Sequence, residues 1–155
     1  MPDNGGPYHQ LQKGRGGDTM MLPFADILRS TKWDQEARAL ADRHYSRQKI
    51  GARQFIPPGE TIVLRNPEGT WLFVWRKSKF RKDIQTGWNC TIFRNESDRL
   101  SSEIILACEA FVEGRKFTFV NAGRVKSENP GCCFLKAGWA KEGKTKKGLI
   151  VLVKA

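Results

Sequence analysis

The sequence lacks any long apolar run. None of its 155 residues falls in a stretch of about 18 consecutive apolar residues, which excludes a membrane-spanning helix and predicts no membrane partner. The first 17 residues are polar and glycine-rich rather than basic and then apolar. We therefore expect no secretory signal and a cytoplasmic location.

Residues that hold metals or form disulfides are also scarce. The chain has four cysteines and two histidines, and the cysteines form no CxxC pair. A structural zinc site needs four well-spaced Cys or His ligands, so we expect no metal site. Without an export signal we expect no disulfide framework either. The thiols are predicted to be reduced and mostly buried.

Positive charge is what the sequence has in excess. The net charge is +11, and residues 1–30 contribute nothing to it, because they carry three basic and three acidic residues. The surplus therefore lies in residues 31–155, where it would attract polyanions such as DNA. Solubility alone is the alternative explanation. Residues 1–20 show no periodicity, and we predict a disordered tail there, followed by one domain over residues 21–155.

The rest of the chain alternates between helical and strand patterns. A helix is predicted from an N-cap at Thr31 to about Tyr45, with an apolar stripe that begins at Trp33. A second helix should begin near Ser101 and end at Gly114, and a third should open at Asn129-Pro130 and stop at Gly138. Strands are predicted over residues 61–65, 70–76, 88–93, 117–121, 139–142 and 148–153. This order indicates an α/β fold, a mixed sheet with helices covering its faces.

The stretch from Cys90 to Val153 resembles the C-terminal half of a GNAT transferase. The matching segments are a strand TIF, a loop RNESD, a helix SSEIILACEAF, a strand FTFVN, a helix NPGCCFLKAGW and a strand GLIVLV. The resemblance implies a GNAT-like, mostly antiparallel sheet with helices on both faces. It also implies acetyl-CoA in a split of the sheet, with its pyrophosphate at the start of the helix after the central strand.

On that resemblance, six residues are candidates for binding the cofactor: Arg94, Asn95, Ser97, Ser101, Ser102 and Asn129. Capping of the helix alone also explains the two adjacent serines. The sequence departs from the family pattern twice. Its loop over residues 94–102 has no glycine, whereas the family's phosphate loop is glycine-rich. Phe134, which cannot donate a proton, stands where the family often has an acid tyrosine.

A narrower resemblance joins two distant segments. The early HYSR and the late NPGCCFLKAGW are similar to Mom-type DNA-modification proteins of phages and their bacterial relatives. That resemblance implies DNA as the substrate and an adenine amine as the acceptor, and it leaves the group donor open.

Four residues are candidates for catalysis: His44, Tyr45, Ser46 and Glu96. His44 has an ordinary pKa near ~6.5 and could accept a proton from an amine, or it could cap the end of the helix. Tyr45 also fits the apolar stripe as a core residue. Glu96 could act as a base, or it could form a surface ion pair with Arg94.

Basic residues at two places are candidates for contact with DNA phosphates: Arg47, Arg76, Lys77, Lys79, Arg81 and Lys82. Phe80 lies among the last of them and could stack on an unpaired base. A solvated loop is the alternative.

Three functions remain open. The first is a GNAT-like transferase that modifies the exocyclic amine of a base in DNA, with adenine as the expected base. The second is an acetyl-CoA-dependent N-acetyltransferase acting on a small amine or a protein. The third is a non-enzymatic nucleic-acid-binding protein. Only the first uses both the positive charge and the order of strands and helices.

Overall fold

The computed structural model describes residues 26–43, 55–56, 59–78, 85–123 and 131–155. Its elements are β1 (Leu28–Ser30), α2 (Gln35–Asp42), β2 (Glu60–Arg65), β3 (Trp71–Lys77), β4 (Trp88–Asn95), α3 (Ser101–Glu109), β5 (Lys116–Val120), α4 (Cys132–Lys136), β6 (Ala140–Lys144) and β7 (Ile150–Lys154). Among these residues, no helix has the length and apolar character that crossing a membrane requires.

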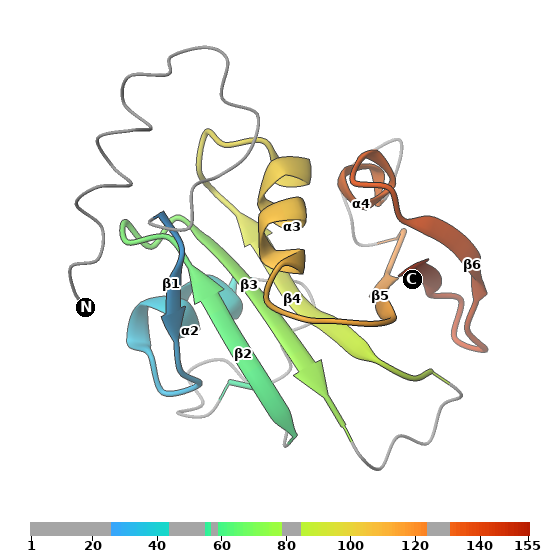
Figure 1. The fold of residues 1–155 in the computed structure, drawn as a ribbon, viewed down its shortest axis with the longest axis horizontal. Helices are drawn as coiled ribbons and strands as arrows, with labels where there is room; N and C mark the ends of the chain where they lie inside the picture. The colour runs from blue at the N-terminus through green and yellow to red at the C-terminus, as the bar shows by residue number, and fades with distance from the viewer. Residues whose placement is uncertain (1–25, 44–54, 57–58, 79–84, 124–130) are drawn as a thin grey trace.

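The seven strands form one mixed sheet. Their order is β1-β2-β3-β4-β5-β7-β6, and every neighbouring pair is antiparallel except β4 and β5, which run parallel (Figure 1). The prediction of a mixed, mostly antiparallel sheet is therefore confirmed. The six strands that the sequence predicted are all present, with ends that differ by no more than two residues.

Residues within the turn itself determine the geometry of the β2–β3 hairpin. The Asn66 side chain closes the turn, because its Oδ1 accepts the backbone N–H groups of Thr70 and Trp71 at 2.8 and 3.0 Å. Gly69 supplies the left-handed backbone that the turn requires, with φ of +72°. The strand register follows directly, with Arg65 opposite Leu72.

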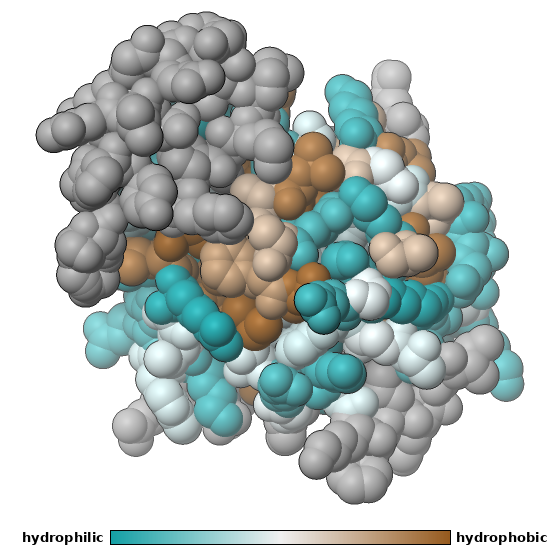
Figure 2. Space-filling view, in the orientation of Figure 1, coloured by the Kyte–Doolittle hydropathy of each residue, from teal (hydrophilic) through white to brown (hydrophobic). Residues whose placement is uncertain are grey.

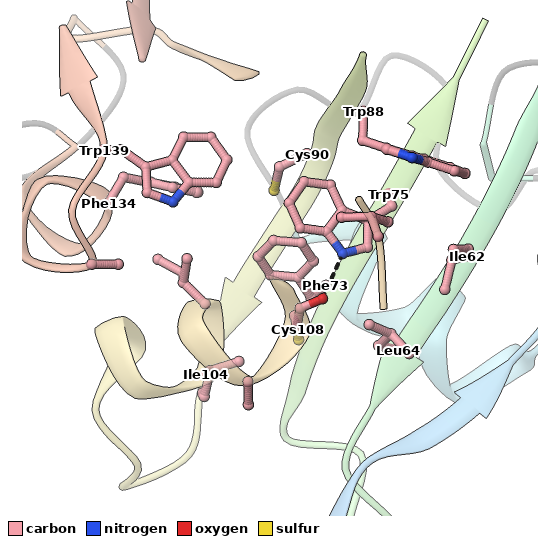
Figure 3. Close-up of a cluster of buried hydrophobic side chains, with 14 of the residues drawn as sticks. Ile62, Leu64, Phe73, Trp75, Trp88, Cys90, Ile104, Cys108, Phe134 and Trp139 are labelled. Atoms are coloured by element: carbon pink, nitrogen blue, oxygen red, sulfur yellow. Dashed lines mark hydrogen bonds between the residues drawn. The ribbon is translucent and has the colours of Figure 1, made fainter. Parts of the chain in front are cut away.

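Alternate residues of β2 and β3 contribute to two hydrophobic clusters. The first is built with α3 and contains Ile62, Leu64, Phe73, Trp75, Ile104 and Cys108. Phe134 and Trp139, from α4 and the residues after it, extend the same cluster, as Figure 3 shows. Trp75 fixes α3 on the sheet, since its Nε1–H donates to the carbonyl of Cys108 at 2.9 Å. The second cluster is built with α2 and contains Ala37, Leu40, Val63, Leu72 and Val74.

The parallel strands β4 and β5 pair over only two positions. Trp88 lies opposite Lys116 and Asn89 opposite Phe117, and the backbone pairing ends there. Beyond it, the Thr118 hydroxyl on β5 donates to the Cys90 carbonyl at 2.9 Å. Figure 1 shows the two strands diverging toward α3 and α4. The sheet thus splits directly after the first residues of β4.

On its other side, β4 carries a bulge. Trp75 pairs with Cys90 and the preceding Val74 pairs with Ile92, so Thr91 has no partner residue on β3. A β-bulge of this kind leaves one residue out of the ladder and is common beside active sites.

The start of α2 differs from the prediction. Its N-cap is Asp34, not Thr31, because the carboxylate accepts from the backbone N–H groups of Glu36 and Ala37. The Thr31 hydroxyl accepts from the N–H of Trp33 instead. Trp33 precedes the helix and is 56% exposed, so the prediction that it lies on the buried stripe was wrong.

The other two helices also begin later or end earlier than predicted. The N-cap of α3 is Leu100, not a serine, and the helix ends at Glu109, before Gly114. Helix α4 begins at Cys132, after Gly131, whereas the predicted start at Asn129 lies outside the described residues. The predicted stop at Gly138 is confirmed, with φ of +94° there.

Candidate functional site

Two arginines and a glutamate join the end of α2 to the loop after β4. The Glu96 carboxylate receives Arg43 Nε at 2.7 Å and Arg94 Nε at 2.6 Å. Arg94 Nη1 also donates to the backbone carbonyl of Arg43 at 2.7 Å. The cluster therefore holds two segments together that lie about 50 residues apart in the sequence.

The cluster determines the charge state of Glu96. Hydrogen bonds from Arg43 and then Arg94 lower the pKa of Glu96 to about 2. A carboxylate with so low a pKa is a weak base at neutral pH. What the arrangement can do is fix the directions of the two guanidinium groups and hold the end of α2 against this loop.

The loop from β4 to α3 is organised by Asn95. Its Oδ1 accepts the backbone N–H of Ser97 at 2.9 Å, and its Nδ2 donates to the Arg99 carbonyl at 2.8 Å and to Ser101 Oγ at 3.0 Å. The Ser97 hydroxyl also donates to Asn95 Oδ1. The structure therefore brings these predicted cofactor-binding residues together, and it uses their side chains to shape the loop.

The start of α3 fits an anionic cofactor only in part. A helix start offers backbone N–H groups without intrahelical partners, here at Ser101 and Ser102, and these suit a phosphate. The side chains of the loop add no surplus charge, because two arginines are matched by Glu96 and Asp98. Arg99 is paired with Asp26 at 3.0 Å, and Arg94 with Glu96. The residues fit one phosphate group and not a polyanion.

A cavity of about 410 Å³ lies where the β2–β3 turn meets the β4–α3 loop. Its lining combines the side chains of Trp71 and Arg99 with three carboxylates, those of Asp26, Glu68 and Asp98. Sequence reasoning missed this cavity, since its walls come from three segments whose meeting depends on the tertiary fold. A negative lining of this kind favours a cationic ligand.

Two groups of basic residues among the described ones lie away from this loop. Arg76 and Lys77 end β3, where Lys77 Nζ lies 5.6 Å from the centre of the Trp88 ring. Arg76 pairs with Asn89, six residues before Asn95, so roughly 20 Å of strand separates it from the loop. The second group is on the β6–β7 hairpin, where hydrophilic residues predominate (Figure 2) and the exposed lysines are Lys141, Lys144, Lys146 and Lys147.

Eight predicted site residues lie outside the described residues: His44, Tyr45, Ser46, Arg47, Lys79, Arg81, Lys82 and Asn129. Arg43, which sequence reasoning missed, comes directly before the first of them. Its signal in the sequence is weak, because a basic residue at the end of a helix is explained by the helix dipole alone.

Buried thiols account for part of the cysteine content. Cys90 and Cys108 are buried in the first hydrophobic cluster, and burial raises the pKa of each thiol well above its ordinary value. Within the part of the chain that the structure describes, no three Cys, His, Asp or Glu side chains are grouped to hold a metal ion.

Comparisons of this chain with protein-family models, with curated proteins and with solved structures give no match.

Proposed function

We propose that this protein is a GNAT-like transferase that modifies the exocyclic amine of a base, adenine, in DNA. The observation that carries the proposal is the early end of the β4–β5 pairing, followed by the loop and helix α3. A parallel pair that opens at its carboxyl ends exposes backbone and side chains from two strands to a ligand. The resemblance of residues 90–153 to the GNAT family supports the same arrangement.

The Arg43–Glu96–Arg94 cluster supports a location for the catalytic residues, beside the carboxyl end of β4. Because Arg43 is held at the carboxyl end of β4, the chain leaves α2 beside that end. His44 is the next residue, and we assign it as the base that accepts a proton from the amine when the nitrogen forms its new bond. Tyr45 and Ser46 belong to the same proposed site, and Glu96 acts as a positioning residue through its two arginines.

For the group donor, the residues present support one contact, between a phosphate of acetyl-CoA and the start of α3. Acetyl-CoA, when bound, would supply an acyl carbon and a thiol leaving group. The N–H groups of Ser101 and Ser102 would hold one of its phosphates. Asn129 is proposed to contact the cofactor as well, on the family resemblance alone.

DNA is the proposed partner because of the charge. The surplus of +11 in residues 31–155 gives affinity for phosphates without reading the sequence. Arg76 and Lys77 are the described members of the proposed contact, together with Arg47, Lys79, Arg81 and Lys82. A base would have to leave the stack to bring its amine to the site.

One observation favours a second candidate. The carboxylates of Asp26, Glu68 and Asp98 around the 410 Å³ cavity would attract a cationic small amine and repel phosphates. An acetyl-CoA-dependent N-acetyltransferase acting on such an amine, or on a protein lysine, would use that cavity for its acceptor.

The test is mass spectrometry of nucleosides from plasmid DNA in cells that express the wild type, His44→Ala or His9→Ala. His9→Ala is the matched control, since it removes the chain's other histidine from residues 1–20. We expect a new modified adenosine with the wild type and the control, and none with His44→Ala. Unmodified DNA from well-expressed, folded wild type would refute DNA modification in that host. Acetylation of polyamines by the purified protein would then support the second candidate, and salt-sensitive DNA binding without turnover would support a binding protein.

A further inference from the structure

Two oxygen atoms inside the sheet have no hydrogen-bond partner. They are Oδ1 of Asn89 and Oγ1 of Thr91, and they are the only buried unpaired side-chain N or O atoms among the residues that the structure describes. Asn89 is 7% exposed. A buried polar group without a partner lowers stability, so native proteins rarely keep one without a reason.

Both oxygens lie at the point where the sheet opens. Asn89 is the last residue of β4 that pairs with β5, and Thr91 is the residue that the bulge removes from the β3 ladder. They are therefore two residues apart on the strand that borders the split, before the loop of Glu96. Neither residue belongs to the acidic cavity or to the arginine cluster.

The chemistry of the two groups restricts the ligand. A carboxamide oxygen only accepts hydrogen bonds, so the missing partner of Asn89 Oδ1 must carry an N–H or O–H. A threonine hydroxyl can donate as well as accept. Together they complement an edge that presents a donor beside an acceptor. An adenine presents such an edge, with its amine beside a ring nitrogen, and asparagine is a common partner of that base.

We propose that Asn89 and Thr91 form a subsite for an adenine base of the bound DNA strand, separate from the place where the acceptor amine would meet His44. Asn89 Oδ1 accepts a hydrogen bond from the exocyclic amine, and the Thr91 hydroxyl donates to the ring nitrogen beside it. The assignment of the base rests on the proposed function. The bond to Asn89 holds this base at the opening of β4 and β5, roughly 20 Å of strand before Asn95.

The structure supplies a matched control for Asn89. Asn66 is the same residue type with the same 7% exposure, but its side chain bonds Thr70 and Trp71. Replacing each by leucine removes the same polar atoms. Asn66→Leu should lower the melting temperature, because it leaves two backbone N–H groups unpaired. Asn89→Leu should leave the melting temperature unchanged or raise it, because the folded protein loses an unpaired oxygen and no bond.

Binding is measured with two probes, a short thymidine oligonucleotide with one central adenine and the same oligonucleotide without adenine. Phosphate contacts are equal in the two, so the ratio of their dissociation constants isolates the base. We expect the wild type to prefer the adenine probe and Asn89→Leu to reduce that preference about tenfold, as for one lost hydrogen bond to a base. Thr91→Val should reduce it by a smaller factor.

Two results would overturn the proposal. In the first, Asn89→Leu lowers the melting temperature as much as Asn66→Leu does, which would mean that Asn89 Oδ1 has a structural partner such as an ordered water. In the second, Asn89→Leu melts like the wild type and keeps the adenine preference.

Failure of the proposed transferase function can be distinguished from failure of the proposed subsite. If cellular DNA is unmodified but the adenine preference exists and depends on Asn89, the subsite stands without the transfer. If Asn89→Leu modifies DNA as the wild type does, the transfer stands without the subsite.

Discussion

The start of α2 depends on one carboxylate whose loss has a cost that can be worked out from the structure. Asp34 caps the helix and receives Arg65 Nε at 2.6 Å, and both side chains of this ion pair are only 12% exposed. Losing an N-cap costs about 1 kcal/mol, and losing a hydrogen bond between charged groups costs about 2 kcal/mol. Asp34→Ala should therefore lower the free energy of unfolding by about 3 kcal/mol.

Asp34→Asn separates the two contributions, because asparagine still caps a helix but carries no charge. It should cost about 2 kcal/mol. With a urea m-value of about 2 kcal/mol/M, the unfolding midpoint should fall by about 1.5 M for the alanine variant and about 1 M for the asparagine variant. Glu36→Gln is the control, since Glu36 is 60% exposed and 3.4 Å from Arg65 Nη1. If all three variants unfold at one midpoint, the reasoning about this carboxylate is refuted.

The same pair should give a defined pH dependence. Burial acts to raise the pKa of Asp34, but hydrogen bonds from Ser30 and Arg65 outweigh it, and the net pKa lies below the ordinary value of 3.8. A carboxyl group with a lowered folded-state pKa contributes stability that is complete above its unfolded-state pKa and is lost as the pH falls through the folded-state pKa. The difference in unfolding free energy between wild type and Asp34→Asn should therefore be constant above pH 3.8 and narrow below it.

Three further predictions concern other parts of the structure. In a carbon-13 NMR titration, the Glu96 carboxyl should titrate near pH 2 in the wild type and closer to its ordinary 4.5 in Arg43→Gln, and equal midpoints would contradict the assigned ion cluster. Trp75→Phe should lower the free energy of unfolding by about 3 kcal/mol in urea, because it opens a space and leaves the Cys108 carbonyl unpaired. Gly87→Ala should destabilise far more than Gly114→Ala: both residues have positive φ, but only at Gly87 would the new Cβ meet a backbone oxygen, that of Arg115, at 2.1 Å. Similar unfolding midpoints for the two variants would show that the backbone at Gly87 can shift to make room for the new Cβ.

The sequence predicted the strands well because their signals are local. The hairpin of β2 and β3 depends on a turn of four residues whose asparagine and glycine act within the turn. Strand β1 was missed, because three residues with exposed or half-exposed side chains show no alternation, and their pairing with β2 depends on residues far along the chain. The N-cap of α2 was missed for the same reason: Arg65, from β2, pairs with Asp34.

The candidate site was predictable in part. The loop after β4 was identified because polar residues follow a buried strand, and the Arg94–Glu96 ion pair was one of the alternatives considered. The contribution of Arg43 could not be derived, since it comes from a contact between residues 53 positions apart. A signal for Asn89 and Thr91 was present in the segment WNCTIF, where two polar residues interrupt an apolar strand. Their lack of partners becomes visible only when the neighbouring strands are in place.

The distribution of hydrogen bonds separates residues that build the site from residues that are free to use it. In the β4–α3 loop, Asn95 and Glu96 already have partners within the protein, and these bonds fix the shape of the loop. In β4, Asn89 and Thr91 have none and reduce stability in the absence of a ligand. Buried polar atoms without hydrogen-bond partners are expected at functional positions rather than at structural ones. The contrast therefore makes Asn89 and Thr91, rather than Asn95 and Glu96, the candidates for a direct hydrogen bond to a ligand, and Glu96 orients the two arginines.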